Sequence, residues 1–170
     1  NLTVLENLMM VPGNQSGESL MNALLKPKMV NEEEKIIKQK ALEVIKFLNL
    51  THLEKELAGN LSGGQKKLLE LGRTMMVDAK IVLLDEVAAG VNRTLLKEVS
   101  NSIFRLNKEK GYTFCMIEHD MDFISKMCDP VIVMSEGSVL FQGTPDEVKN
   151  NEQVIESYLG RRTVLEKEKN

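Results

Sequence analysis

LSGGQKKLLELGR, residues 61–73, places two adjacent glycines after a serine, at the start of an amphipathic basic helix. The first amides of a helix have no intrahelical partner, so such a start is suited to meet an anion. Ser62 and Gln65 also form a capping box pattern, which explains these two residues without any ligand. The box does not explain Gly63 and Gly64, because consecutive glycines carry an entropic cost and let the backbone approach a partner closely. Both interpretations can hold together.

The sequence contains no phosphate-binding loop of the form G-x-x-x-x-G-K-[ST] that would hold a nucleotide by itself. Residues 13–19, GNQSGES, look similar but have one residue too few between the glycines, and no strand precedes them. Glu18 stands where a lysine is needed, and its carboxylate would repel phosphate. We therefore interpret this stretch as an ordinary loop, and any anion at Ser62 needs another group to hold it.

Composition excludes several classes of protein. The 170 residues are 42% hydrophobic, enough for one globular domain or most of one, and the formal net charge is −3. Acidic and basic residues are mixed along the chain, so there is no basic stripe for nucleic acid and no polybasic membrane anchor. No apolar run approaches the roughly 18 residues needed to span a bilayer. Cys115 and Cys128 lack a metal or disulfide spacing and are predicted to be small buried core residues.

The first half of the chain predicts helices. Thr3 and Glu6 match a capping box, and Asn31 with Glu34 forms a second cap-like pair. Behind the second pair, apolar residues fall on one face at helical spacing, namely Ile37, Ala41, Val44, Ile45 and Leu48. The pattern predicts a long amphipathic helix. Because the first capping box starts almost at Asn1, we expect the chain to be a fragment whose missing upstream part contains the phosphate loop.

In the second half of the chain, the hydrophobic pattern changes from helical spacing to short continuous apolar runs. Residues 80–86, 112–120 and 130–137 are short apolar runs rich in β-branched residues, which predicts strands covered on both faces in a mainly parallel sheet. A helical pattern lies between the first two, giving the strand, helix, strand order of an α/β domain. A turn at Glu136-Gly137, a short strand, and a helix that starts at Thr144-Pro145 are expected to follow.

Chemistry is expected where two strands end. Asp85 and Glu86 follow four apolar residues, and ligands of open α/β sheets bind at that edge. An aspartate there can hold Mg²⁺, while the neighbouring glutamate can orient and deprotonate an attacking water. His119 ends the next strand, where a neutral imidazole can donate to a phosphate oxygen. Taken singly, each residue is better explained by a solvent-facing or structural role. The set, with the glycine-rich helix start, favours convergence on a phosphate.

These residues resemble motifs of the ATP-binding subunits of ABC transporters. LSGGQ (61–65) resembles the family signature, IVLLDE (81–86) the Walker B strand, AAGVN (88–92) the D-loop region, and His119 the switch histidine. The resemblance implies an α/β fold: part of an ABC-type P-loop NTPase nucleotide-binding domain, with a mainly parallel RecA-like sheet. It implies a helical subdomain at 1–77, the carboxyl-terminal half of the nucleotide-binding core at 78–143, and terminal helices with a charged tail at 144–170. The Walker A loop and the glutamine-bearing loop would lie before Asn1.

The resemblance also implies a mechanism. Two such domains pair head to tail, as a homodimer or heterodimer, and ATP lies between the phosphate loop of one and the signature of the other. The signature residues Ser62, Gly63, Gly64 and Gln65 would then contact ATP held by the partner chain. Asp85 would serve Mg²⁺, Glu86 and His119 would be catalytic, and Asn92 would belong to the D-loop. ATP hydrolysis would drive the membrane subunits, whereas this fragment alone is expected to be inactive.

Four stretches resemble the subgroup that imports branched-chain amino acids: LSGGQKKLLELGR (61–73), AGVN (89–92), IEHDMDFI (117–124) and the ending VIESYLG (154–160). That subgroup implies transmembrane permease subunits, an indirect link to a substrate-binding protein, no nucleic acid, and a peripheral place on the cytoplasmic face of the plasma membrane. Val87 and Arg93 depart from the family, which commonly has proline or a small turn residue there. Two alternatives stay open: a non-catalytic partner cassette, and a soluble ABC ATPase that acts on ribosomes or DNA.

Overall fold

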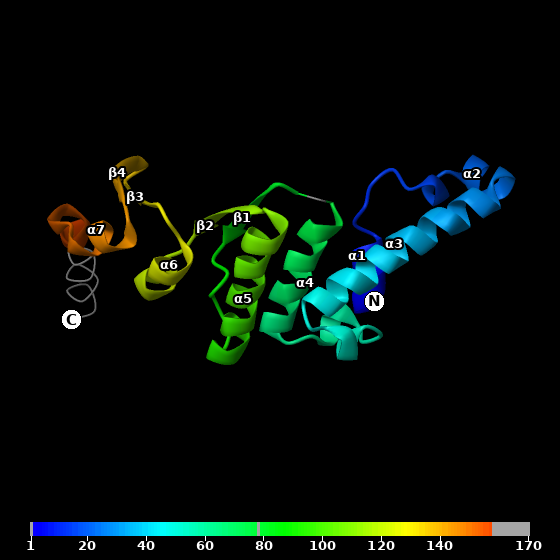
Figure 1. The fold of residues 1–170 in the computed structure, drawn as a ribbon, viewed down its shortest axis with the longest axis horizontal. Coiled ribbons are helices and arrows are strands. Elements are labelled where there is room, and N and C mark those ends of the chain that lie inside the picture. Colours follow the sequence, from blue (N-terminus) through cyan, green and yellow to red (C-terminus); the bar gives the residue numbers. More distant parts are fainter. Residues whose placement is uncertain (1, 78, 158–170) are drawn as a thin grey trace, which may run out of the picture. The chain divides into compact units, whose positions relative to one another are not determined.

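The computed structural model describes residues 2–77 and 79–157, which divide into two compact units, Asn1–Cys115 and Met116–Asn170 (Figure 1). The predicted charged tail and the last three residues of VIESYLG lie outside the described residues. The division of the chain by role, at residues 77 and 143, stays a prediction.

The first unit is mostly helical, with one strand pair late in its sequence (Figure 1). Its α-helices are α1 (Val4–Met9), α2 (Leu20–Leu25), α3 (Pro27–Phe47), α4 (Gly63–Met76) and α5 (Arg93–Lys110). Its short 3₁₀ turns are Ser16–Glu18, Thr51–Leu53 and Ala58–Asn60, and its strands are β1 (Ile81–Asp85) and the start of β2 (Thr113–Ile117).

The core of the first unit forms where α1, α3 and α4 meet. The predicted apolar face of α3 is confirmed, since Ala41, Val44, Ile45 and Leu48 are buried. Gly72 of α4 lies at the crossing, because a Cβ added there would come within 2.9 Å of Leu48, 3.1 Å of Val44 and 3.2 Å of Leu8. A larger residue would push three helices apart, so the close packing of this core depends on that glycine.

Of the two helix starts predicted in the first half of the chain before Ser62, one is confirmed and one is wrong. The capping box of α1 is present: the Glu6 amide donates to Thr3 Oγ1 at 3.2 Å, and the Thr3 amide donates to the Glu6 carboxylate at 2.8 Å. The cap-like pair Asn31 and Glu34 is not a cap, because α3 already begins at Pro27. Proline is well suited to a first helical position, since its missing N–H would have no intrahelical partner there.

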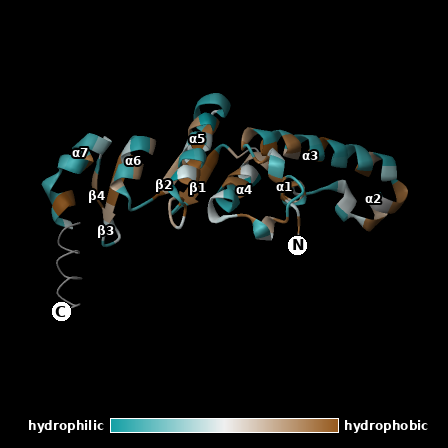
Figure 2. Ribbon diagram, turned by 90° about the horizontal axis from the view of Figure 1, so that it is seen from below, coloured by the Kyte–Doolittle hydropathy of each residue, from teal (hydrophilic) through white to brown (hydrophobic). Residues whose placement is uncertain are grey.

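Strands β1 and β2 form a two-stranded sheet, and Thr113 N donates to Lys80 O at 2.8 Å. The prediction that these strands are covered on both faces is wrong for β1. Val82 is 4% exposed and lines a small interior space with Val99 and Ile103 of α5, whereas Leu83 is 77% exposed. Apolar residues concentrate along both strands (Figure 2). One face of the pair is therefore packed, and the other is open in this chain.

The second unit is an antiparallel strand pair with short helices. Its elements are α6 (Met121–Met127), β3 (Val131–Ser135), β4 (Ser138–Gly143) and α7 (Pro145–Asn150). β3 pairs antiparallel with β4, and among the described residues these two strands form a sheet of their own. The predicted turn is confirmed, because Glu136 and Gly137 both have positive φ, 50° and 78°, as a tight hairpin turn requires.

The core of the second unit and its last helix follow the sequence. Val131, Val148 and Val154 are buried together, with Ile124 and Leu140 among the partly buried residues packed on them. α7 begins with the predicted box, in which the Thr144 amide donates to the Glu147 carboxylate at 2.7 Å.

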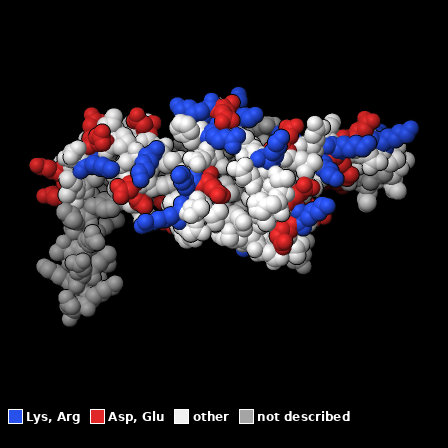
Figure 3. Space-filling model, turned by 60° about the horizontal axis from the view of Figure 1, so that its bottom comes forward, with Lys and Arg blue, Asp and Glu red and all other residues white. Residues whose placement is uncertain are grey.

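The α/β class is confirmed, but the predicted burial of the cysteines is wrong for Cys115, which is exposed, while Cys128 is half-buried. Within residues 2–77 and 79–157, no helix combines the length and the apolar character that crossing a membrane requires. Figure 3 shows lysine, arginine, aspartate and glutamate side chains interspersed on the face that it presents.

Candidate functional site

The start of α4 presents backbone amides next to an exposed serine. Ser62 is the N-cap, and the reciprocal bonds of the capping box are both formed, with Ser62 N donating to Gln65 Oε1 at 2.9 Å and Gln65 N donating to Ser62 Oγ at 3.4 Å. Ser62 and Gly63 are exposed, and Gln65 is half-buried. The capping box orders this end of the helix, and an ordered, exposed helix start is the kind of backbone that suits an anion.

Gly63 and Gly64, the first two residues of α4, differ in their packing. Gly64 is buried against α5: a Cβ added there would lie 2.5 Å from Leu95 Cβ, closer than real side chains approach. At Gly63 the nearest atom to an added Cβ is Gly90 O, at 3.5 Å, an ordinary contact. Helix packing therefore explains Gly64 fully, while the bare, exposed backbone at Gly63 has no packing reason.

The end of β1 carries the predicted carboxylates. Asp85 is the last residue of the strand and Glu86 follows it, and both are exposed. Glu86 has a φ of 46°, in the left-handed region that costs a residue with a side chain roughly 1–3 kcal/mol. Val87, only 5% exposed, anchors the next position in the core. A strained glutamate beside a buried anchor is the arrangement expected where the direction of a functional side chain matters.

A turn at residues 86–91 leads from the carboxylates into α5. Ala89 N donates to Glu86 O at 3.1 Å, Val91 N donates to Ala88 O at 3.3 Å, and Gly90 has a φ of 69°. The turn brings Gly90 near Gly63, since a Cβ added at Gly63 would lie 3.5 Å from Gly90 O. Within this unit, the segment that follows Asp85 and Glu86 therefore lies near the glycine-rich helix start.

Asn92, predicted to belong to this site, has a structural role as well. It is the N-cap of α5, and its side chain accepts a hydrogen bond from Leu95 N at 2.9 Å. Sequence reasoning missed this cap, although an asparagine three residues before the first apolar helical position was a usable signal. It also missed Leu95 as the residue that fixes Gly64.

His119 belongs to the second unit, where it lies exposed in the loop after β2. The following residue, Asp120, caps α6 by accepting from Asp122 N at 2.9 Å and Phe123 N at 3.1 Å. The cap fixes the loop at its far end and leaves His119 on the surface of its unit. The two units are described separately, so the convergence of His119 with Asp85 and Glu86 stays a prediction.

A magnesium site at Asp85 was also predicted. Among the described residues, no group of three or more histidine, cysteine, aspartate or glutamate side chains could hold a metal ion by itself. Mg²⁺ bound with a nucleotide is usually held by one or two carboxylates together with phosphate oxygens and waters. The exposed carboxylate of Asp85 at a strand end fits that donor set.

Family models match both ends of the chain. A model described as ABC transporter matches residues 2–89, and one described as branched-chain amino acid ATP-binding cassette transporter matches residues 138–163. The first match includes the signature helix start, Asp85 and Glu86. This chain belongs to the ABC transporter family.

Curated relatives agree with this assignment. The chain is 42% identical over 159 residues to the "Probable branched-chain amino acid transport ATP-binding protein LivG" of Archaeoglobus fulgidus, covering 94% of this chain and 60% of that protein. It is 40% identical over 163 residues to the protein of the same name from Methanocaldococcus jannaschii, with 94% and 62% covered. The high-affinity branched-chain amino acid transport ATP-binding protein BraF of Pseudomonas aeruginosa is 32% identical over 159 residues, with 94% and 62% covered. The chain thus spans about 60% of the length of these relatives.

Solved structures support the fold. An ATP-binding cassette of an ABC transporter in its ADP conformation matches with a TM-score of 0.73 and 37% identity, over 94% of this chain and 63% of that one. A nucleotide-free ATP-binding cassette matches with a TM-score of 0.74 and 38% identity, over 92% and 62%. The predicted fold, part of an ATP-binding cassette, is confirmed.

Proposed function

We propose that this chain is part of an ATP-hydrolysing subunit that powers a branched-chain amino acid importer. The names of the relatives from three organisms support the substrate class. The observation that supports the ATPase assignment is that the exposed start of α4 and the exposed carboxylates of Asp85 and Glu86 both lie within residues 2–89, which the ABC transporter model matches.

The start of α4 binds ATP that a second ABC subunit holds. Ser62 and Gly63 are exposed, so their backbone and hydroxyl groups can reach phosphate oxygens presented from outside the unit. Gln65 stabilises this end through the capping box, and Gly64 lets α4 sit close to α5. The binding group in this arrangement is the helix start itself, and the buried glycine positions it.

The strand ends serve the nucleotide on their own chain. Asp85 contributes a carboxylate to Mg²⁺, which neutralises charge on the phosphates when it is bound. Glu86, whose backbone is in the left-handed region, orients the attacking water and accepts its proton. His119 donates to the terminal phosphate, and Asn92 holds the D-loop turn at the start of α5.

The working assembly is a head-to-tail pair of ATP-binding subunits attached to transmembrane permease subunits, on the cytoplasmic face of the plasma membrane. Closure of the pair on ATP and its reopening after hydrolysis shift the permease between two states. A substrate-binding protein delivers the amino acid, so this subunit does not select it.

Glu86→Gln in the native gene product, assayed with its membrane partner, tests the proposal. Loss of the general base lowers steady-state ATP hydrolysis about 10²- to 10⁴-fold while ATP binding persists. Glu98→Gln is the matched control, because Glu98 is an exposed glutamate on α5 outside the site. Hydrolysis by Glu86→Gln at the rate of the control variant refutes the role of Glu86. Absence of ATP binding in the unmodified protein refutes the nucleotide function.

A further inference from the structure

Helix α2 presents its large apolar side chains to solvent. Leu20, Met21, Leu24 and Leu25 are 68–82% exposed, and among the described residues they are four of the six most exposed large apolar side chains. At about 3.6 residues per turn, these four positions fall within about 140° of the helix surface. They are called the α2 patch below. Exposed apolar residues that occur singly are ordinary, whereas several on one face of a helix mark an interaction surface.

The other side of α2 packs on the first unit. α2 contacts the turn Ser16–Glu18 and α3, and it lies beside the first turns of α3, away from α1 (Figure 1). That turn is itself fixed to α3, because Ser16 N donates to the Glu33 carboxylate at 2.9 Å. Asn22, on the side of α2 away from the patch, is half-buried. The helix thus keeps an asparagine half-buried and its large apolar residues in the open, the reverse of the usual amphipathic arrangement.

The end of α2 maintains this arrangement. Lys26 N donates to Asn22 O at 2.8 Å, which closes the last turn, and Pro27 begins α3 directly afterwards. A proline fixes its own φ and disfavours helical backbone at the residue before it. The break between the two helices is therefore a property of the sequence, and it separates the α2 patch from the apolar face that α3 buries.

The segment that carries the patch is basic. Residues 19–31 contain Lys26 and Lys28 but no aspartate or glutamate, so the formal charge of this segment is +2, whereas that of the whole chain is −3. The nearest acids along the chain are Glu18 and Glu32. Both lysines are exposed, and no ion pair joins either of them to a described residue. Exposed aliphatic side chains next to positive charge are complementary to the surface of an anionic membrane.

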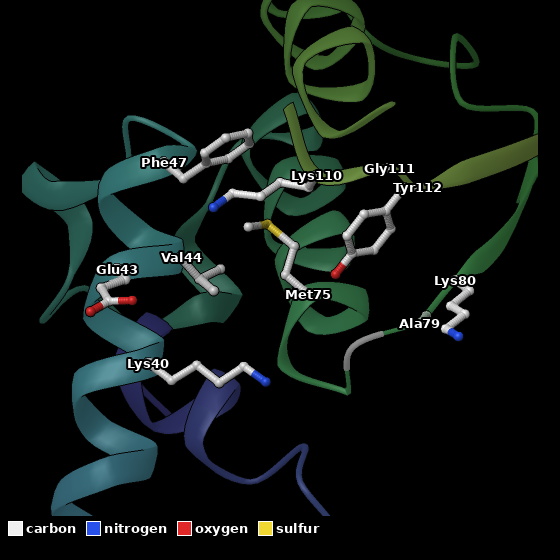
Figure 4. Close-up of a pocket in the computed structure, with 10 residues that line it drawn as sticks. All are labelled: Lys40, Glu43, Val44, Phe47, Met75, Ala79, Lys80, Lys110, Gly111 and Tyr112. Carbon is white, nitrogen blue, oxygen red and sulfur yellow. The ribbon is translucent and has the colours of Figure 1, made fainter. Parts of the chain in front are cut away.

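The composition of the patch favours lipid over a protein or a small ligand. Protein interfaces are anchored mainly by tryptophan, tyrosine and arginine in shaped pockets, whereas the patch consists of leucine and methionine. The cavity of about 370 Å³ in this unit is lined by Val44, Phe47 and Met75 among others, and by no residue of α2 (Figure 4). Aliphatic side chains on an outward surface can enter the acyl-chain boundary of a bilayer without a shaped complement.

We propose that the α2 patch inserts into the surface of an anionic phospholipid membrane, with Lys26 and Lys28 at the level of the head groups. The contact is weak and reversible, because it has few apolar side chains and only two charges. It therefore adds to attachment through permease subunits and does not replace it. The inference rests on the proposed function only in that a transport subunit works beside a membrane, and α2 takes no part in ATP hydrolysis.

Flotation of the native gene product with lipid vesicles, in the absence of its permease, tests the contact. Vesicles of phosphatidylcholine alone are compared with vesicles in which half of the lipid is phosphatidylglycerol. Met21→Gln removes apolar surface from the patch, and Met10→Gln is its matched control, because Met10 is 66% exposed, against 68% for Met21, and follows α1. Lys26→Gln is compared with Lys46→Gln, an exposed lysine in the last turn of α3.

We expect the unmodified protein to float with the anionic vesicles and to bind the neutral vesicles more weakly. Met21→Gln lowers the partition coefficient about tenfold, the effect of losing one buried apolar side chain. Lys26→Gln lowers it about fivefold on the anionic vesicles. The two control variants leave it unchanged, and ATP binding persists in all four variants.

Four results overturn the proposal. The unmodified protein does not float with either kind of vesicle, or it binds both kinds equally. Met21→Gln and Met10→Gln weaken vesicle binding to the same extent. Met21→Gln loses its permease while vesicle binding is unchanged, which would assign the patch to a protein partner. None of these results affects the ATPase assignment, which the Glu86→Gln variant tests separately.

Discussion

Replacing Gly64 by alanine tests whether helix packing, rather than ligand approach, requires that glycine. The new Cβ would lie 2.5 Å from Leu95 Cβ, 2.8 Å from Cδ1 and 3.0 Å from Cγ of the same residue. The closest of these contacts is roughly 0.9 Å short of the 3.4 Å at which ordinary contact begins. Because Cβ is fixed to the backbone, no rotamer of Leu95 relieves it, and α4 and α5 have to move apart.

The expected loss of stability follows from two opposing terms. Overpacking of this kind costs about 1–3 kcal/mol. Alanine recovers up to about 1 kcal/mol of helix propensity over glycine, less near a helix start. The net loss is about 1–2 kcal/mol in the free energy of unfolding, which lowers the Tm of a domain of this size by about 2–8 °C.

Gly63→Ala is the matched control for this experiment. Its added Cβ meets Gly90 O at 3.5 Å, an ordinary contact, so the free energy of unfolding changes by less than about 0.5 kcal/mol. Under the proposed function it still lowers ATP hydrolysis, because its methyl group occupies the surface that approaches the phosphate. Thermal unfolding followed by circular dichroism measures both variants in the native gene product. Equal melting temperatures for Gly63→Ala and Gly64→Ala would refute the packing argument.

Two further predictions concern helix starts. Asn92→Ala removes the acceptor for Leu95 N and costs about 1 kcal/mol, whereas Asn92→Asp keeps the cap. Urea unfolding compares the two, and equal losses would contradict a capping role; reduced ATP hydrolysis in a stable Asn92→Asp would instead indicate a D-loop role. The second prediction concerns Glu6. A hydrogen bond from the Thr3 backbone amide and, to a smaller extent, one from the Thr3 hydroxyl lower the pKa of Glu6 below its usual 4.5. The ionised carboxylate therefore stabilises the fold above that pH, and this stabilisation is lost as the pH falls through the lowered pKa. In Glu6→Gln, the Tm should decline less steeply as the pH is lowered. A decline as steep as that of the unmodified protein would contradict this prediction.

Local signals in the sequence predicted those features that depend on neighbouring residues along the chain. The capping boxes at Thr3, Ser62 and Thr144 were predicted and are present, because each is closed by a residue three positions later. The pair Asn31 and Glu34 has a similar pattern but is not a cap, since Pro27 starts α3 one turn earlier. A capping pattern therefore predicts a helix start only where no earlier residue can serve.

Burial was predicted less well than helix starts. Continuous apolar runs predicted strands covered on both faces, yet Leu83 is exposed and Cys115 lies on the surface. An apolar run indicates that both faces of a strand can be buried. It does not indicate whether the same chain supplies a layer that covers them. The pairing of β3 with β4 shows the same limit, because strand direction depends on the partner that the chain finds.

The sequence alone determined the motifs, their order and the helix starts that present them, because these depend on residue types at fixed spacing. The resemblance to the ABC transporter family therefore follows from local patterns alone. Only the tertiary structure separated the two glycines of the signature: Gly64 is required by contact with Leu95, and Gly63 is left open beside Gly90. That distinction depends on how closely α4 packs on α5, and distances between segments far apart in the chain are not encoded in any local pattern.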